Sequence, residues 1–64
     1  MRLIIVYYKR NIGILNTIFL DITTSCKLSE IIENEKRKIL RNDGFDDNVF
    51  NNFSKIYSLV YWLK

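Results

Sequence analysis

The first third of the chain carries two different patterns of hydrophobic residues. Leu3–Tyr8 is branched or aromatic at every position, which predicts a strand buried on both of its faces. Asn11 and Gly13 then supply turn chemistry. Beyond this turn the apolar positions alternate, with one face formed by Ile14, Ile18, Leu20 and Ile22 and the other by Leu15, Thr17, Phe19, Asp21 and Thr23. We therefore predict a β-hairpin over residues 3–22, with a helix over Gly13–Ile22 as the competing interpretation.

The middle of the chain has the spacing of an amphipathic helix. Its apolar stripe consists of Leu28, Ile31, Ile32, Ile39 and Leu40. We predict a helix through Glu30–Arg41, because acidic residues come early and basic residues late, as the helix dipole favours. Gly44 is suited to a left-handed cap after the last turn. Thr23, Thr24 and Ser25 are candidates for the N-terminal cap.

The last twenty residues fit two interpretations. The segment from Ile56 to Trp62 is rich in residues with high strand propensity, which predicts a short helical turn near Asn48–Phe53 followed by a strand over Lys55–Leu63. The alternative is one amphipathic helix over residues 46–64, which would give a ββαα fold. Tyr57, Tyr61 and Trp62 fall in this segment under either interpretation.

The predicted order of elements is that of a minimal β-grasp domain of the α+β class, and the residues resemble ubiquitin-like proteins. The segment from Thr17 to Ile31 resembles the second strand, the loop and the start of the helix of that family, and Ser54–Tyr61 is similar to its last strand. The chain departs from the family at Glu35, where the helix would bury an apolar residue, and between Gly44 and Ile56, where two further strands have no room. The chain ends without a Gly-Gly tail, so the resemblance implies a non-conjugating module.

Composition limits the chemistry that a single small domain, residues 1–64, can perform. The sequence has no histidine and one cysteine, so it lacks the commonest general base and zinc ligand and cannot form an internal disulfide. We expect Cys26 to be a loop residue without a chemical role. We expect Asp43, Asp46 and Asp47 to form a helix stop and turn, since they lack the alternation of a calcium loop. The expectation is a protein without catalysis, cofactor or metal.

The formal net charge of +3 permits an acidic partner without requiring one. The candidate basic patch consists of Lys9, Arg10, Lys36, Arg37, Lys38 and Arg41. It would suit the phosphates of RNA or an acidic protein, although a solvated face is the simpler interpretation. No apolar run approaches the length of a membrane span, and the single thiol favours a cytoplasmic location. The abundance of Ile, Asn and Lys is typical of an AT-rich genome, such as that of a virus or a parasite.

Aromatic side chains are the main candidates for contact with a partner. Phe19 and Trp62 are predicted on the sheet face away from the helix, and Tyr57 and Tyr61 complete the candidate partner-binding set. The edge of Lys55–Leu63 is predicted to be unpaired, so a partner strand or a second copy of the chain could add to it. The leading hypothesis is a protein-interaction module that docks on a larger assembly. The alternatives are a basic accessory component of a ribonucleoprotein such as a ribosome, and a virus- or phage-encoded inhibitor of a host enzyme.

Overall fold

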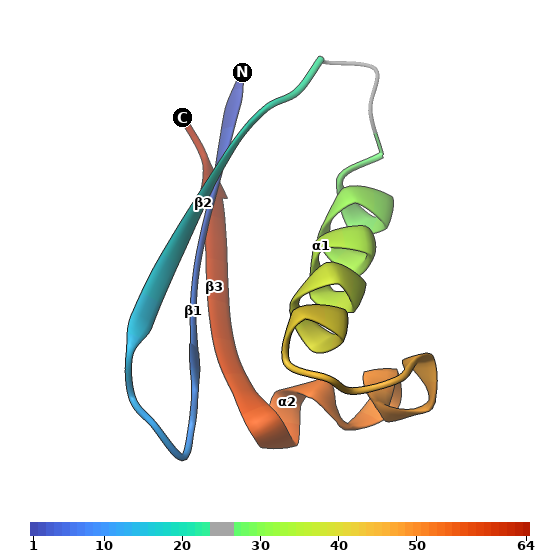
Figure 1. Ribbon diagram of the computed structural model, residues 1–64. Coiled ribbons are helices and arrows are strands. Elements are labelled where there is room, and N and C mark those ends of the chain that lie inside the picture. The colour runs from blue at the N-terminus through green and yellow to red at the C-terminus, as the bar shows by residue number, and fades with distance from the viewer. Residues whose placement is uncertain (24–26) are drawn as a thin grey trace.

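A computed structural model of the chain describes residues 1–23 and 27–64. Its strands are β1 (Arg2–Lys9), β2 (Leu15–Asp21) and β3 (Tyr57–Leu63), and its helical elements are α1 (Leu28–Asn42), the 3-10 helix η1 (Asp47–Asn52) and α2 (Phe53–Ile56). The helices lie together on one side of the sheet, and the other side is bare (Figure 1). The predicted α+β class is therefore confirmed.

The predicted hairpin forms with β1 antiparallel to β2, so the helical interpretation of Gly13–Ile22 is wrong. Its turn is closed by the carbonyl of Lys9, which accepts from the N–H groups of Ile12 at 3.0 Å and Gly13 at 2.8 Å. Gly13 adopts a φ of 73°, a left-handed conformation that glycine tolerates best. The alternation predicted for the second strand places Ile18 and Leu20 toward the helix and Phe19 away from it.

Helix α1 forms over the predicted segment, and its apolar stripe faces the sheet. Ile32, Ile39 and Leu40 are buried, and Gly44 follows the last turn with a φ of 85°, as expected for the C-terminal cap. The prediction for the other end was wrong at Thr23, because the N-cap position is Lys27, which makes no side-chain capping bond. Thr24 and Ser25, the other two cap candidates, lie outside the described residues.

The C-terminal segment contains both a helical part and a strand. The predicted turn is found as η1, where the Asp46 side chain accepts from the N–H of Asn48, and α2 continues it to Ile56. Tyr57 then has extended backbone angles, φ −123° and ψ 151°, and β3 begins there. The alternative of one long helix over residues 46–64 is wrong, because the β-propensity of residues 57–63 and pairing with β1 outweigh the helical spacing.

The sheet has the order β2-β1-β3, and both pairs are antiparallel. The last strand lies beside the first. Because β2 and β3 each run antiparallel to β1, they are parallel to each other, and α1 belongs to the crossover connection between them. This crossover carries the helices over one face of the sheet and leaves the other face without cover.

The core lies between the sheet and the helices, in two clusters. One joins Leu3 and Ile5 of β1 to Ile32 of α1. The other joins the end of α1 to Phe53 and Tyr57. The prediction that the first strand is buried on both faces holds for residues 3–5 and fails for residues 6–8, which are half-buried. Val6 and Tyr8 lie on the outer face, and Tyr7 packs against the core but also lines a hollow on the helix side.

Candidate interaction surface

The uncovered side of the sheet carries three rows of side chains that cross all the strands; we call it the open face. The register places Ile4 of β1 between Phe19 of β2 and Trp62 of β3. Two residues further along, Val6 is flanked by Thr17 and Val60, and in the third row Tyr8 is flanked by Leu15 and Ser58. Successive side chains of a strand point to opposite sides, so these residues share one face. The prediction that Phe19 and Trp62 lie on the outer face is confirmed.

The open face is apolar and largely accessible. Leu15 is 65% exposed, Phe19 62%, Val60 57% and Trp62 46%, whereas Ile4 in the central strand is 7% exposed because its cross-strand neighbours flank it. At one end of the face Arg2 and Asp21 form an exposed ion pair, with 3.6 Å between Nε and Oδ1. Large apolar side chains flanked by charges in this way are typical of surfaces that bind other proteins.

Tyr61 belongs to the same strand as Trp62 but points to the helix side of the sheet. It is 46% exposed because β3 is an edge strand with β1 as its one partner among the described strands. Tyr61 therefore lies at the surface, as a candidate contact residue must. The prediction of an unpaired edge along the last strand agrees with this topology.

Tyr57 is the exception among the predicted contact residues, because the structure places it in the core. It is 1% exposed, its ring stacks on Phe53 with 4.7 Å between centroids, and its hydroxyl donates a hydrogen bond to Asp43. The prediction that Tyr57 belongs to the partner-binding set is therefore wrong, because Tyr57 is a core residue. The physical reason is that β3 begins directly after α2, close to the end of α1. The side chain of Tyr57 therefore packs against Phe53 of α2 and against Ile39 and Leu40 of α1.

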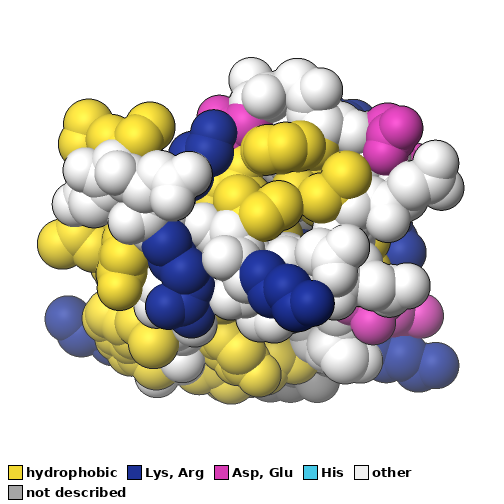
Figure 2. Space-filling view, turned by 90° about the horizontal axis from the view of Figure 1, so that it is seen from below, with side chains coloured by type: hydrophobic (Ala, Val, Ile, Leu, Met, Phe, Trp, Pro, Cys, Tyr) yellow, Lys and Arg dark blue, Asp and Glu magenta, His cyan; other side chains and the backbone are white. Residues whose placement is uncertain are grey.

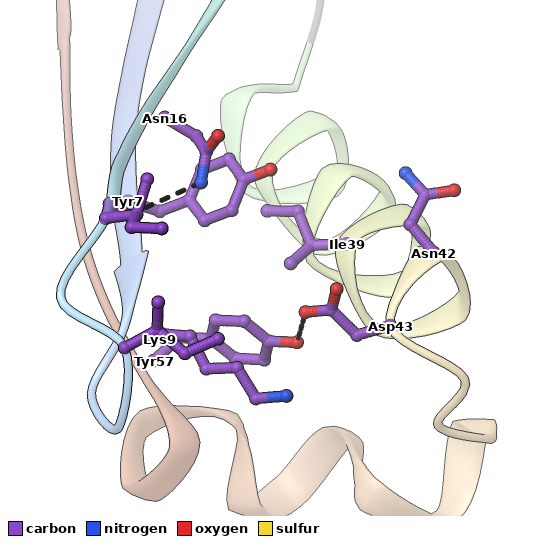
Figure 3. Close-up of a pocket in the computed structure, with 9 residues that line it drawn as sticks. Tyr7, Lys9, Asn16, Ile39, Asn42, Asp43 and Tyr57 are labelled. Carbon is purple, nitrogen blue, oxygen red and sulfur yellow. Dashed lines mark hydrogen bonds between the residues drawn. The ribbon is translucent and has the colours of Figure 1, made fainter.

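A hollow of about 290 Å³ opens beside this buried tyrosine, between the hairpin turn and the end of α1 (Figure 3). Its lining includes the rings of Tyr7 and Tyr57, which meet edge to face at 6.3 Å, together with Lys9 and Asp43. Burial is the main cause that raises the pKa of Tyr57, and its hydrogen bond to Asp43 is the second. Burial also raises the pKa of Tyr7, and the negative charge of Asp43 adds to that shift. Both hydroxyls thus remain protonated at neutral pH as hydrogen-bond donors.

Four of the six predicted basic residues lie around the segment that joins α1 to β3. The ammonium of Lys9 lies 5.3 Å from the ring centroid of Phe45, that of Lys36 lies 5.4 Å from Phe53, and the guanidinium of Arg37 lies 4.5 Å from Phe50. Nε of Arg10 donates to the carbonyl of Ser54 at 3.1 Å. Seen from this end, Lys and Arg side chains lie among hydrophobic ones (Figure 2).

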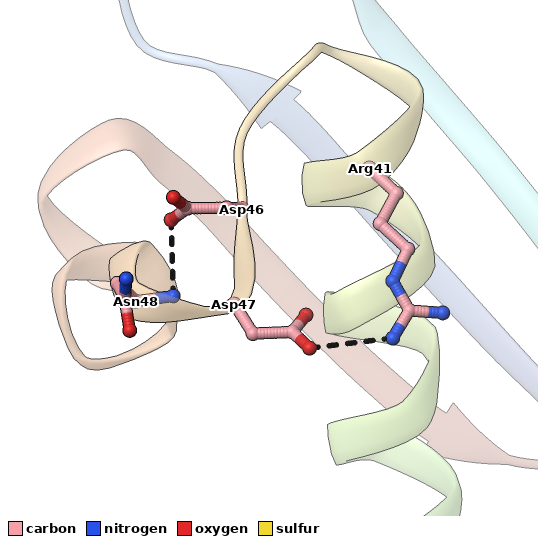
Figure 4. Close-up of polar contacts among 4 residues, drawn as sticks. All are labelled: Arg41, Asp46, Asp47 and Asn48. Atoms are coloured by element: carbon pink, nitrogen blue, oxygen red, sulfur yellow. Dashed lines mark hydrogen bonds and ion pairs between the residues drawn. The ribbon is translucent and has the colours of Figure 1, made fainter.

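The other two predicted basic residues are neutralised locally. Lys38 pairs with the buried Glu35 at 3.1 Å, and Arg41 pairs with Asp47 at 3.4 Å, which ties the end of α1 to η1 (Figure 4). The six residues therefore do not form one continuous patch, since consecutive helix residues point in different directions. Arg10 and Lys36 do come together, because both line a second hollow beside β3.

The three aspartates after α1 have separate structural contacts. Asp43 accepts from Tyr57, Asp46 accepts from the N–H of Asn48 at 3.1 Å, and Asp47 pairs with Arg41. Within residues 1–23 and 27–64, no group of three or more potential ligands is arranged to hold a metal ion. The three aspartate contacts themselves agree with the predicted helix stop and turn. Cys26, the other residue considered for chemistry, lies outside the described residues.

Two further findings concern membrane-spanning helices and likeness to known proteins. In the described part of the chain, no helix has the length and hydrophobicity needed to cross a membrane. Comparisons with protein-family models, curated proteins and solved structures gave no match. Function is therefore inferred from the geometry of the open face itself.

Sequence reasoning missed the Tyr57–Asp43 pair and the aromatic supports of the basic side chains. Residues 43 and 57 are separated by 14 positions, and no local pattern announces a contact at that distance. The cation–ring contacts also join residues that are far apart in the sequence. The density of Phe45, Phe50 and Phe53 near the basic end of α1 was the one available signal.

Proposed function

We propose that this protein is a non-catalytic interaction module that docks on a larger protein through the open face of its sheet. The observation that carries the proposal is a row of large apolar side chains across the sheet, buried in the central strand and exposed on both outer strands. Phe19 and Trp62 flank the shielded Ile4, so they present one continuous apolar surface and not isolated contacts. Aromatic residues in such a setting contribute most of the free energy of binding at protein interfaces.

Physical reasoning favours a protein over a small molecule on this surface. The open face is the uncovered side of a three-stranded sheet, whereas small ligands bind in concave sites that bury most of their area. The two core clusters lie on the other side of β1, so the apolar residues of the open face are not needed to fill the core. Covering them with a partner would remove apolar surface from water at no cost to internal packing.

The ubiquitin-like β-grasp relationship remains a proposal that is supported by the pattern of residues 17–31 and 54–61. Its support from topology is the position of the last strand beside the first. The antiparallel direction of that pair is a departure, because a ubiquitin-like sheet joins its first and last strands in parallel. The docking proposal depends on the exposed residues and does not require this relationship.

The proposal predicts that polar substitutions on the open face remove partners without unfolding the chain. We expect Phe19→Thr and Trp62→Thr each to abolish co-purification of the proteins that the wild-type chain captures in cells of its source organism. Recovery would be measured by quantitative mass spectrometry, and folding would be checked by circular dichroism.

Ile12→Thr is the matched control, since Ile12 is 60% exposed and apolar but lies in the hairpin turn. This variant should capture the same proteins as the wild type. Equal recovery by all four chains would rule out the open face as the docking surface.

A ribonucleoprotein role is the second candidate, and one observation favours it. Lys9, Lys36 and Arg37 lie over phenylalanine rings, and none of the three forms an ion pair within the described residues. Phosphate groups could contact cations held in this way. Binding of oligouridine, a single-stranded RNA, separates this candidate from the first.

A further inference from the structure

The edge of β3 presents backbone groups that point away from the sheet. Arg2 and Lys64 exchange two backbone hydrogen bonds, at 3.2 and 2.9 Å. Every second residue of β3 counted back from Lys64 therefore directs its N–H and C=O groups toward β1. In an antiparallel ladder these positions alternate with positions that face outward. Leu59, Tyr61 and Leu63 are the outward positions, and none of their backbone groups has a partner in a described strand.

This edge lacks the features that usually prevent strand addition. Natural edge strands are blocked by charged residues, prolines or bulges. Within Tyr57–Leu63 every residue is uncharged, no proline occurs, and the register with β1 continues over seven pairs without a bulge. The edge is therefore a competent template for another strand.

A hollow of about 250 Å³ lies along the same strand on the helix side. Leu59, Tyr61 and Phe53 supply its apolar lining, and Arg10 and Lys36 supply its charges. An added strand would direct every second side chain toward this hollow and the alternate side chains onto an extension of the open face. The hollow thus selects side chains at every second position of the partner.

The charges around the hollow are all positive and are held in place. Arg10 is anchored by the carbonyl of Ser54, and Lys36 lies over the ring of Phe53. The described residues that line the hollow include no carboxylate. The ion pairs of the described residues involve other cations, namely Arg2, Lys38 and Arg41. Two preplaced cations beside an apolar lining favour an acidic side chain.

We propose that an extended acidic segment of the partner protein adds to the β3 edge as a fourth strand, with a carboxylate directed toward Arg10 and Lys36. This inference rests on the proposed docking function and names the chemistry of the partner. A second copy of the chain is disfavoured, because antiparallel pairing of two β3 strands would bring Lys64 of one copy toward the end where the other carries Arg10 and Lys36.

The probe for the test is a ten-residue peptide of alternating valine and glutamate, blocked at both ends, with a valine–lysine peptide of the same length as its counterpart. Binding to the full chain would be followed by NMR at millimolar peptide. We expect the glutamate peptide to slow amide exchange at Leu59 and Tyr61 by at least about tenfold at saturation. The lysine peptide should leave exchange unchanged.

Substitutions at the edge separate the backbone contribution from the side-chain contribution. Tyr61→Pro removes an outward N–H and should weaken binding at least about tenfold, whereas Tyr61→Ala, which loses the same ring but keeps the N–H, should bind better than the proline variant. Arg10→Gln and Lys36→Gln should each weaken binding about threefold, as for a rim ion pair. Lys27→Gln, which removes an equal charge at the far end of α1, should have no effect.

Several results would overturn the inference. These are equal binding of both peptides, no binding at millimolar peptide, protection at Thr17 and Phe19 of the β2 edge, or β3 amides already protected in a dimer. Binding of oligouridine through Arg10 and Lys36 in place of the peptide would favour the ribonucleoprotein role. Partner capture that is lost in Phe19→Thr and intact in Tyr61→Pro would refute strand addition alone and leave docking through the open face standing.

Discussion

At the scale of single residues, Tyr57 shows how one side chain joins parts of the fold that are distant in sequence. Its ring lies between Tyr7 of β1 and Phe53 of α2, and its hydroxyl reaches Asp43 at the end of α1. A hydrogen bond from a buried hydroxyl to a carboxylate stabilises the folded chain more than a hydrogen bond between solvated groups does. This arrangement makes Tyr57 a structural residue and not a surface contact.

We expect Tyr57→Phe to lower the free energy of unfolding at neutral pH by about 1 kcal/mol, because Asp43 loses its donor while the ring remains. Urea denaturation followed by circular dichroism would measure the change. Tyr61→Phe is the control, since Tyr61 is 46% exposed, and it should alter stability by less than about 0.5 kcal/mol. Equal losses in the two variants would contradict the role assigned to the Tyr57–Asp43 bond.

The same variant should change how stability depends on pH. The pKa of Tyr57 is raised in the folded chain, so above about pH 10 the unfolded chain loses the proton first and is favoured. The contribution of Tyr57 to the free energy of unfolding should therefore be constant below that pH and fall above it. The fall should be smaller in Tyr57→Phe, and Tyr7, whose pKa is also raised, accounts for part of what remains.

At the scale of elements, α1 is unusual in burying a carboxylate on its apolar face. Glu35 is 7% exposed and lies between Ile32 and Ile39 on that face, with Lys38 as its ion-pair partner. The partner side chain is 67% exposed, so the pair is solvated at one end and buried at the other. A buried carboxylate of this kind contributes little net stability, because its desolvation offsets the attraction.

Replacing Glu35 by a hydrophobic residue of similar size should therefore stabilise the protein. We expect Glu35→Leu to raise the free energy of unfolding by about 1 kcal/mol and Lys38→Gln to lower it by less than about 1 kcal/mol. Thermal and urea unfolding would measure both variants. A loss of more than about 1 kcal/mol in Glu35→Leu would show that the carboxylate makes a stabilising contact that the ion pair does not describe.

At the scale of the whole molecule, the chain is a sheet with one covered side and one open side. The hydrophobic core contains eight buried residues of the described chain, and most of them lie between the sheet and the helices. A domain of this size has a small total stability, of about 3–10 kcal/mol. Truncating a side chain on the covered side should therefore lower the free energy of unfolding far more than truncating one on the open face.

Phe53 and Phe19 provide the comparison, because they are the same residue type on opposite sides of the sheet. Phe53 is 4% exposed and Phe19 is 62% exposed. We expect Phe53→Ala to cost about 3–5 kcal/mol and leave much of the chain unfolded at 25 °C, whereas Phe19→Ala should cost less than about 0.5 kcal/mol. Circular dichroism melting curves would show this. A large loss in Phe19→Ala would mean that the open face contributes to folding.

Much of the architecture was determined by the sequence alone. The alternation of Ile18, Phe19 and Leu20 predicted the second strand and the outward position of Phe19 correctly. The stripe from Leu28 to Leu40 predicted α1, and the branched and aromatic residues of β3 outweighed the helical spacing. These features were predictable because each depends on neighbours two to four positions apart, which backbone geometry places on a common face.

The tertiary structure decided what depends on residues far apart in the chain. The burial of Tyr57, the dispersal of the six predicted basic residues and the meeting of Arg10 with Lys36 all follow from how β3 returns beneath α1. Local pattern could not distinguish Tyr57 from Tyr61, because both lie on the same side of one strand and differ in what covers them. Burial is a property of the assembled layers, so it was settled by the packing of α1 and α2 on one side of the sheet.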